Sequence, residues 1–416
     1  MDAAAAPDPG RPIAEEYVHL ALAVDRHSPG YVDAYLGPPE WRQAAAGGVV
    51  PSLPELSSRA ADLAAATEAA GFLDAQRKGF LTRQIRAMRT SLSLLQGDAM
   101  SLADETESLY DVRPHWTEET EFEQAHRQLE ELLPPGDSLR ERMVAFKQQL
   151  QLTAGQTQDI LPLILGRLRE LTRSRFPLPQ TESVDMQFVH DKPWMAYNWY
   201  LGNHRSRIEI NTDLPMRLNQ LVEIVAHEAY PGHHTHGCVL ENRLVSGAGH
   251  IEHSVVLLYS PASVVSEAVA TSALHVAMSH EDQAAWFGDE LFPRVGLQHL
   301  DARQERLVSL AMEGLEGTAG NGAYLLHERK ASDDEVFRYF KRYALDTDAE
   351  ARKMIEFLSN PLERSYIFTY QAGRSLLKEL FDAHADVSHW FTRVISEPVT
   401  PTQIREWTRS NHPSKT

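Results

Sequence analysis

The sequence predicts a mainly α-helical fold with two helical lobes and one small antiparallel sheet. From Ala14 to about Thr172, apolar residues recur at steps of three and four, the period of a helix with one buried face. Between Pro177 and Asp213 the pattern alternates instead, as expected for short strands. Helical patterns then return almost to the C-terminus, so the sheet is expected to be a minor part of the structure.

The chain is long enough for one large domain, because it has 416 residues and 43% of them are hydrophobic. Residues 1–13 are rich in Ala, Pro and Gly and predict a flexible N-terminal tail. No repeat of fixed period and no low-complexity linker divides the remainder, so residues 14–416 are expected to form a single domain. Its first lobe would comprise residues 14–175, and residues 176–416 would form the lobe that carries the site.

Composition excludes several classes of protein. Lys and Arg total 40 against 58 for Asp and Glu, and the net charge of -18 argues against nucleic acid or an anionic membrane as the main partner. The single cysteine, Cys238, excludes an intramolecular disulfide and a Cys-rich metal site, which leaves His and carboxylate side chains as metal ligands. We find neither a signal peptide nor a run of about 18 apolar residues, so we expect a cytoplasmic protein without a membrane span.

The first lobe is predicted to consist of antiparallel helices joined by short loops. Proline and glycine interrupt its helical pattern at residues 37–39, 51–54 and 134–136. Helices over about residues 138–152 and 158–172 would close this lobe.

Three short antiparallel strands are expected next. Their apolar residues are Met186 and Phe188 in the first strand, Met195, Tyr197 and Trp199 in the second, and Ile208 and Ile210 in the third. Gly202-Asn203-His204 fits a turn between the last two strands. A helix would follow, with Thr212 or Asp213 as its cap and Pro215 in its first turn. The later helical patterns cover about residues 263–278, 302–316, 333–343, 349–357 and 365–384.

The segment His227-Glu228-Ala229-Tyr230-Pro231-Gly232-His233 carries the strongest chemical signal. A His-Glu pair on a helix supplies zinc peptidases with a metal ligand and with a base that takes a proton from water. The usual second histidine, four residues after the first, is replaced here by Pro231. Pro231 removes a helical hydrogen bond and Gly232 tolerates unusual dihedrals, so the helix is expected to break. The spacing leaves both His233 and His234 open as the second ligand.

This segment resembles the motif of the bacterial family of predicted zinc peptidases catalogued as domain of unknown function 885. Members carry His-Glu-x-x-Pro-Gly-His at the end of a helix, and that alignment selects His233. Later matches follow in the family order over roughly the last two thirds of the chain. Glu267-Ala268-Val269-Ala270 is similar to a Glu-Gly-Trp-Ala motif, Leu326-His327 to a Leu-His pair, and Tyr370-Gln371-Ala372-Gly373 to Tyr-x-x-Gly.

The resemblance implies a two-lobed helical architecture of the zinc-peptidase type, with zinc held by His227, His233 and Glu267 and a small sheet beside the site helix. The chain departs from the family at Ala268-Val269, where Gly-Trp is usual, at His236, where glutamine is usual, and before Leu-His, where an acidic residue is absent. These departures leave the metal ligands intact, but the resemblance then does not define the substrate preference. Glu223 and Glu252 are alternatives to Glu267. Glu252 belongs to a His-rich stretch, residues 249–253, which indicates either a surface loop or a second binding site.

Catalytic roles follow from charge. Glu228 would act as the general base and later deliver the proton to the leaving nitrogen. Tyr370 is our first candidate to donate a hydrogen bond to the developing oxyanion, and His327 is the second. For both side chains, burial against a satisfying neighbour is an equally consistent explanation.

Substrate contacts are expected from two places. The strand that contains Ile208, Ile210 and Asn211 would bind an extended substrate through main-chain hydrogen bonds. Arg374 would either bind a substrate carboxylate in a bidentate way or form a salt bridge.

We therefore expect a hydrolase that holds one Zn²⁺ per chain and cleaves peptide bonds, although Mn, Fe or Co also suits these ligands. One alternative is an amidase or esterase specialised for a small metabolite. Another is a catalytically inactive homologue that binds metal and a ligand. Glu228 favours an enzyme, because a mere scaffold has no need of a base beside the metal.

Overall fold

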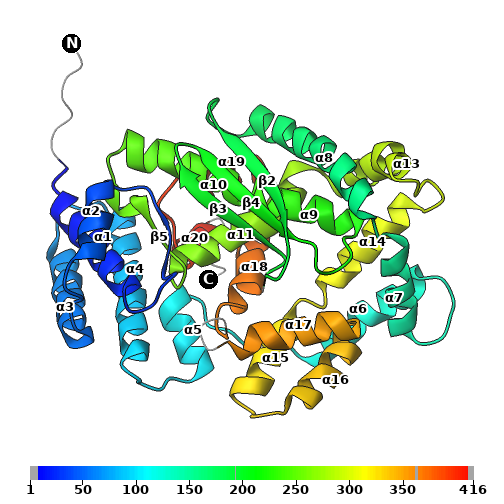
Figure 1. Ribbon diagram of the computed structural model, residues 1–416, viewed down its shortest axis with the longest axis horizontal. Helices are drawn as coiled ribbons and strands as arrows, with labels where there is room; N and C mark the ends of the chain where they lie inside the picture. Colours follow the sequence, from blue (N-terminus) through cyan, green and yellow to red (C-terminus); the bar gives the residue numbers. More distant parts are fainter. Residues whose placement is uncertain (1–7, 193, 361–363, 411–416) are drawn as a thin grey trace.

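The computed structural model describes residues 8–192, 194–360 and 364–410, and it is mainly helical with two small sheets (Figure 1). This confirms the predicted fold class. The first elements are α1 Arg11–Asp25, β1 Val32–Tyr35, α2 Pro39–Gly47, α3 Leu53–Ala69, α4 Ala75–Leu95, α5 Leu102–Tyr110, α6 Glu119–Leu132, α7 Leu139–Gln149 and α8 Ala154–Arg175. The middle elements are β2 Ser183–Val189, β3 Ala196–Gly202, β4 Arg205–Asn211, α9 Leu218–Glu228, α10 His233–Leu240, η1 Glu241–Gly247, η2 Ile251–Ser254, β5 Val255–Leu257 and α11 Pro261–Ala277. The last elements are α12 His280–Trp286, η3 Phe287–Leu291, α13 Phe292–Arg294, α14 Ala302–Glu313, α15 Gly317–His327, α16 Asp333–Tyr343, α17 Asp348–Ser359, α18 Phe368–Ala383, α19 Val387–Val394 and α20 Pro401–Ser410.

In the N-terminal part, the helices α3, α4, α5, α7 and α8 each begin after a residue whose side chain caps the helix. The side chains of Ser138 and Thr153 each accept a hydrogen bond from the backbone N–H three residues on. In turn, the side chains of Glu141 and Gln156 accept one from the backbone N–H of Ser138 and Thr153. The Thr153 cap explains why α8 begins at Ala154, four residues before the predicted start. At the N-terminus, α1 begins at Arg11, so the expected tail of 13 residues is too long. The part of that prediction that concerns residues 1–7 lies outside the described residues.

Hydrophobic cores join the two sides of the lobe boundary predicted near residue 175. One core brings Leu20 and Leu81 together with Val265 of α11 and Leu377 of α18. A second core joins α6, α7 and α8 to the sheet and to α9, and a third, smaller core holds α15, α16 and α17. The two larger cores meet at α11, since this helix contributes residues to both of them.

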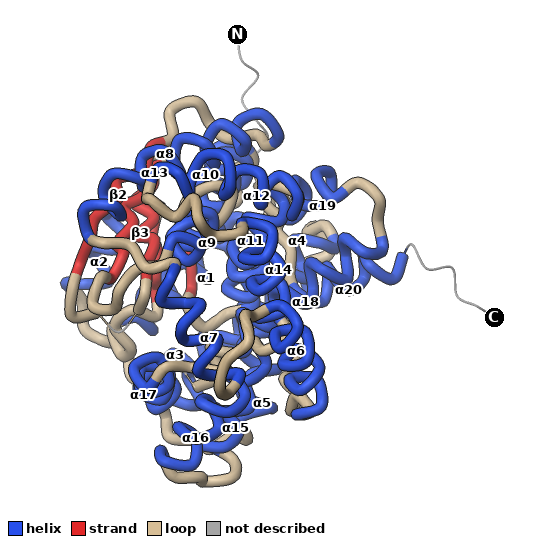
Figure 2. The backbone as a smooth tube through the Cα atoms, turned by 90° about the vertical axis from the view of Figure 1, so that its right-hand side faces the viewer, coloured by secondary structure: helices blue, strands red, loops and turns tan. Residues whose placement is uncertain are grey.

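The three-stranded sheet has the order β2-β4-β3 and lies at one side of the molecule (Figure 2). Strands β3 and β4 are antiparallel, and Gly202, Asn203 and His204 form the predicted turn with positive φ values of 74°, 53° and 58°. However, β2 runs parallel to β4, so the prediction of three antiparallel strands is wrong for this pair. The reason is that the chain passes from β2 across to the far side of β4 before it enters β3. A second sheet, β1 with β5, is antiparallel.

Helix α9 carries the first half of the motif, and it begins later than predicted. Its cap is Arg217, without a side-chain hydrogen bond, so the predicted caps Thr212 and Asp213 and the predicted place of Pro215 are wrong. Residues 212–217 instead form a connection whose backbone is held by its neighbours. Thr212 donates to the carbonyl of Val189, and Leu152 donates to the carbonyl of Met216.

The predicted later helices correspond to α11, α14, α16, α17 and α18, and α16 has the predicted bounds. No helix in the described ranges combines the length and the apolar character that a membrane crossing requires.

Candidate metal centre

The helix that carries the motif breaks where the sequence predicts. Helix α9 ends at Glu228 and α10 begins at His233. The amide of Gly232 donates to the carbonyl of Ala226 over 3.0 Å. A Cβ atom on Gly232 would lie 1.8 Å from the carbonyl oxygen of His227, so only glycine fits this position. The break folds the chain back and brings His233 beside His227.

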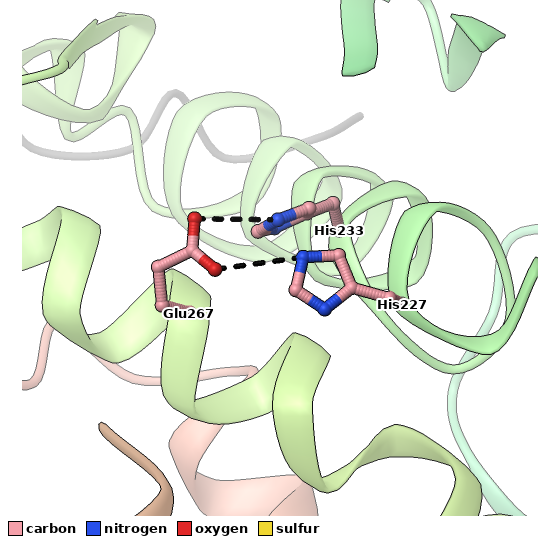
Figure 3. A group of neighbouring side chains, drawn as sticks. All are labelled: His227, His233 and Glu267. Carbon is pink, nitrogen blue, oxygen red and sulfur yellow. Dashed lines mark ion pairs between the residues drawn. The ribbon is translucent and has the colours of Figure 1, made fainter. Parts of the chain in front are cut away.

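Three predicted ligands converge from three helices, as Figure 3 shows. Nε2 of His227 lies 3.5 Å from Oε2 of Glu267, and Nε2 of His233 lies 3.7 Å from Oε1 of the same carboxylate. The two imidazole rings stand 4.7 Å apart at 89°. One candidate ligand atom from each residue lies within 4.8 Å of the others. The helices α9, α10 and α11 therefore supply one ligand each.

The donor set fits a zinc ion. Bonds of about 2.0–2.1 Å in a tetrahedral site put neighbouring ligand atoms roughly 3.4 Å apart, close to the 3.5 and 3.7 Å found here. Oε2 of Glu267 is buried and has no hydrogen-bond partner among the described residues, a costly state that a cation would relieve. Oε1 accepts a hydrogen bond from the Tyr366 hydroxyl over 2.7 Å. Nδ1 of His233 lies 2.9 Å from Oγ of Ser266, which leaves Nε2 for a metal.

Burial sets the charge states of these groups. It lowers the pKa of His233 to about 4 and, with the neighbouring His233 and Arg374, holds the pKa of His227 well below its usual value. Both rings are thus neutral near pH 7, as metal ligands must be. Burial also raises the pKa of Glu267 to about 7, against the lowering effect of the Tyr366 hydrogen bond. The pKa of Glu228 is raised well above its usual value by burial first and then by Glu267.

These shifts predict how zinc affinity depends on pH. Below about pH 7 the carboxyl of Glu267 must lose a proton before it binds metal, so affinity should fall about tenfold per pH unit down to pH 5. The imidazole of His233 adds no further slope in that range, because its pKa of about 4 keeps it neutral. Isothermal titration with zinc from about pH 5 to pH 8 measures this dependence.

Tyr366→Phe tests the cause of this pH dependence. The variant loses the hydrogen bond that lowers the pKa of Glu267, so the pH below which zinc affinity begins to fall should be higher than in the unchanged chain. A zinc affinity that does not change between pH 5 and pH 7 would contradict the assignment of Glu267 as a ligand.

His234 is fully buried and faces the sheet. Its Nδ1 lies 2.8 Å from Oγ of Ser206 in β4, and its Nε2 lies 3.1 Å from Oε2 of Glu182. The hydroxyl of Tyr230 donates to the same carboxylate oxygen. These contacts attach the motif to the sheet, so of the two histidines left open by spacing only His233 lies beside His227.

The alternative carboxylates do not join the centre. Glu223 lies one turn before His227 on α9, is 54% exposed and has Oε1 3.9 Å from Nη2 of Arg306. Both oxygens of Glu252 accept hydrogen bonds from Arg77.

The two candidates for oxyanion stabilisation have different surroundings. The ring of Tyr370 stands 5.7 Å from that of Tyr366, the residue bonded to Glu267, so Tyr370 is one aromatic contact away from a ligand. Nε2 of His327 lies 2.7 Å from the carbonyl oxygen of Leu358, so His327 joins α15 to α17. This hydrogen bond fits the structural explanation of His327, and its catalytic role stays a prediction.

Arg374 forms the salt bridge that was its alternative explanation. Its Nη1 lies 3.2 Å from Oε1 of Glu313, and its Nη2 lies 3.1 Å from Oε1 of Glu316. A substrate carboxylate would have to displace both glutamates, so the bidentate role is not supported.

The expectation for the substrate-binding strand needs a correction. Strand β4 lies between β2 and β3 and pairs with both along its length, so its main chain has no free edge. Ile208 and Ile210 are fully buried, and the Asn211 side chain donates to the carbonyls of Lys192 and Trp194. Among the described strands, β2 and β3 each pair only with β4, so they are the two edge strands of this sheet, and β3 is the one that contacts the end of α9, through Asn198.

Three groups near the centre were missed by the sequence analysis. Tyr366 lies four residues before Tyr370, in the turn that precedes α18, so its spacing could have suggested it. Nδ2 of Asn198 in β3 donates to the carbonyl of Glu228 over 2.6 Å and fixes the end of α9. The charge of Asp33 in β1 raises the pKa of both Glu228 and Glu267, and its carboxylate accepts a hydrogen bond from Tyr197. Asp33 is far from the motif along the chain and carries no sequence signal.

No family model and no curated protein matches the chain. Solved structures do resemble it. One is a "putative lipoprotein" from Colwellia psychrerythraea, with a TM-score of 0.50, 13% identity, and coverage of 97% of this chain and 77% of that one. Another is a "putative lipoprotein of unknown function" from Shewanella oneidensis, with a TM-score of 0.48, 12% identity, and coverage of 88% and 75%. At such identities the first likeness concerns the fold alone.

Proposed function

We propose that the chain is a zinc-dependent hydrolase of peptide or related amide bonds, of the family that its motifs resemble. The observation that carries this proposal is the convergence of His227, His233 and Glu267, with an unpartnered buried carboxylate oxygen among them. Glu228 lies beside these ligands, with Oε1 3.9 Å from Nε2 of His227. Two neutral imidazoles and one carboxylate form the ligand set of a catalytic zinc site, and the adjacent carboxyl is placed as its base.

When bound, zinc would polarise the scissile carbonyl and lower the pKa of a water molecule. Glu228 is the group of this chain that would take the proton and pass it to the leaving nitrogen. Asn198 would hold Glu228 in place through the carbonyl bond, and Tyr366 would orient the carboxylate of Glu267. Tyr370 remains the proposed donor to the developing oxyanion.

Peptides are the substrate class that the surroundings favour. Of the two edge strands of the sheet, β3 is the one whose Asn198 side chain donates to the carbonyl of Glu228 at the end of α9. An extended peptide added to the edge of β3 would therefore pass close to the centre. The side chains of His227 and His233 are 23% and 19% exposed, which gives a substrate access to them.

We keep the cytoplasm as the proposed location, which fractionation of cells would test.

The proposal is tested with a library of fluorogenic peptides and a set of small amides and esters. We expect peptide cleavage by the zinc-loaded protein, loss of more than about 99% of it after chelation, and recovery when zinc is added back. Cleavage of small amides but of no peptide would favour the metabolite amidase. Zinc binding without cleavage of any compound would favour the inactive homologue.

A further inference from the structure

We infer that His250, Glu252 and His253 form a second metal site, which takes a divalent first-row cation such as Zn²⁺. The three residues lie in and just before η2, and one candidate ligand atom from each lies within 4.8 Å of the others. They share no residue with the first centre. This site accounts for the His-rich stretch that the proposed hydrolase does not use.

Unpartnered nitrogen atoms point to a ligand at this place. Nδ1 of His250 and Nε2 of His253 are both buried and have no hydrogen-bond partner among the described residues. A buried ring nitrogen normally has a partner, because it gives up water on folding. Two such atoms beside a carboxylate form the donor set that zinc and related cations prefer. The ring of Phe80 packs 4.5 Å from the ring of His253 and limits how it can turn.

The charges around the site suit a cation. Glu252 is 1% exposed, and Arg77 donates to its two oxygens over 2.5 and 3.0 Å. Arg77 also binds both oxygens of Asp8, so the two carboxylates and one guanidinium leave one negative charge. Each carboxylate oxygen has a second lone pair, so Glu252 can bind Arg77 and a metal together. Arg77 thereby orients the ligand, as outer partners do in metal sites.

The position in the fold indicates a structural role. η2 leads into β5 and then into α11, the helix that carries Glu267 of the first centre. Arg77 and Phe80 belong to α4, so the cation would attach the segment before α11 to the N-terminal helices. The second site would stabilise the frame of the first without taking part in its chemistry.

The test counts zinc per chain by elemental mass spectrometry after dialysis against a fixed free zinc concentration. We expect two zinc ions in the unchanged chain, one in His250→Ala/His253→Ala and one in His227→Ala/His233→Ala. All four substitutions together should leave none. The exposed pair His115→Ala/His299→Ala is the matched control and should keep two.

The outcomes separate this inference from the proposed hydrolase. If the unchanged chain binds one zinc and His227→Ala/His233→Ala binds none, the second site is overturned while the first stands. If the single zinc is lost only in His250→Ala/His253→Ala, the second site stands and the proposed function fails. If His250→Ala/His253→Ala does not fold, as judged by circular dichroism, the zinc content of His227→Ala/His233→Ala still tests the second site. One zinc in that variant supports the second site, and no zinc overturns it.

Discussion

Glu228→Gln is expected to lower kcat for peptide cleavage by about 10²- to 10⁴-fold, the usual contribution of a general base. Glutamine has the shape of glutamate but cannot take a proton. Because Glu228 is not among the three converging ligands, the zinc content of the first centre should not change. The measurement is kcat on the best peptide of the library, with zinc per chain determined on the same sample.

The matched control for Glu228→Gln is Glu223→Gln, five residues earlier on α9. Glu223 is 54% exposed and its nearest cation, Arg306, is 3.9 Å away, so its loss should change kcat by less than about fivefold. If Glu228→Gln stays within that same range while holding its zinc, the proton is handled by another group and the proposed mechanism is wrong.

Local rules explain why most helices could be predicted from the sequence. Many of the helices have their own period and their own side-chain cap, as α16 illustrates. Ser332 and Glu335 form a capping box at its start, and its predicted bounds, Asp333–Tyr343, are those of the structure. Errors arose where distant partners decide. The backbone of Thr212 bonds to Val189, that of Met216 bonds to Leu152, and the Asp213 side chain accepts from the amide of Asp191. Nearby side-chain caps therefore did not determine where α9 begins.

Strand direction also depends on distant partners. The alternating pattern identified β2, β3 and β4, but it is the same for parallel and antiparallel pairing. Only the order β2-β4-β3 reveals that β2 is parallel to β4 and that β4 has no free edge.

The candidate site also combines features that nearby residues determine with features that distant residues determine. The broken helix followed from Pro231 and Gly232, two adjacent residues, and the structure confirms it. The choice of His233 over His234 required the family resemblance, because helical spacing alone favours neither. Side chains that support the centre from elsewhere in the chain, namely Asn198, Asp33 and Tyr366, could not be recognised, since contacts between distant segments exist only in the folded chain.

Gly232→Ala is expected to weaken zinc binding at the first centre by about 100-fold or more. The added Cβ would meet the carbonyl oxygens of His227 at 1.8 Å and of Ala226 at 2.5 Å, and neither atom can move without moving α9. The backbone must open, which carries His233 away from His227 and Glu267. A displacement of about 1 Å is enough to cost a site roughly 100-fold. We also expect a loss of about 1–3 kcal/mol in the free energy of unfolding.

Gly166→Ala is the matched control, because Gly166 is an exposed residue of α8 where an added Cβ would meet no side chain within 4 Å. Alanine there should raise the free energy of unfolding by about 0.5–1 kcal/mol and leave zinc binding unchanged. The measurements are zinc titration and denaturant unfolding of both variants. If Gly232→Ala binds zinc as tightly as the unchanged chain, the ligands do not depend on the tight turn after α9. The centre would then have to be held by some feature other than the break at Pro231 and Gly232.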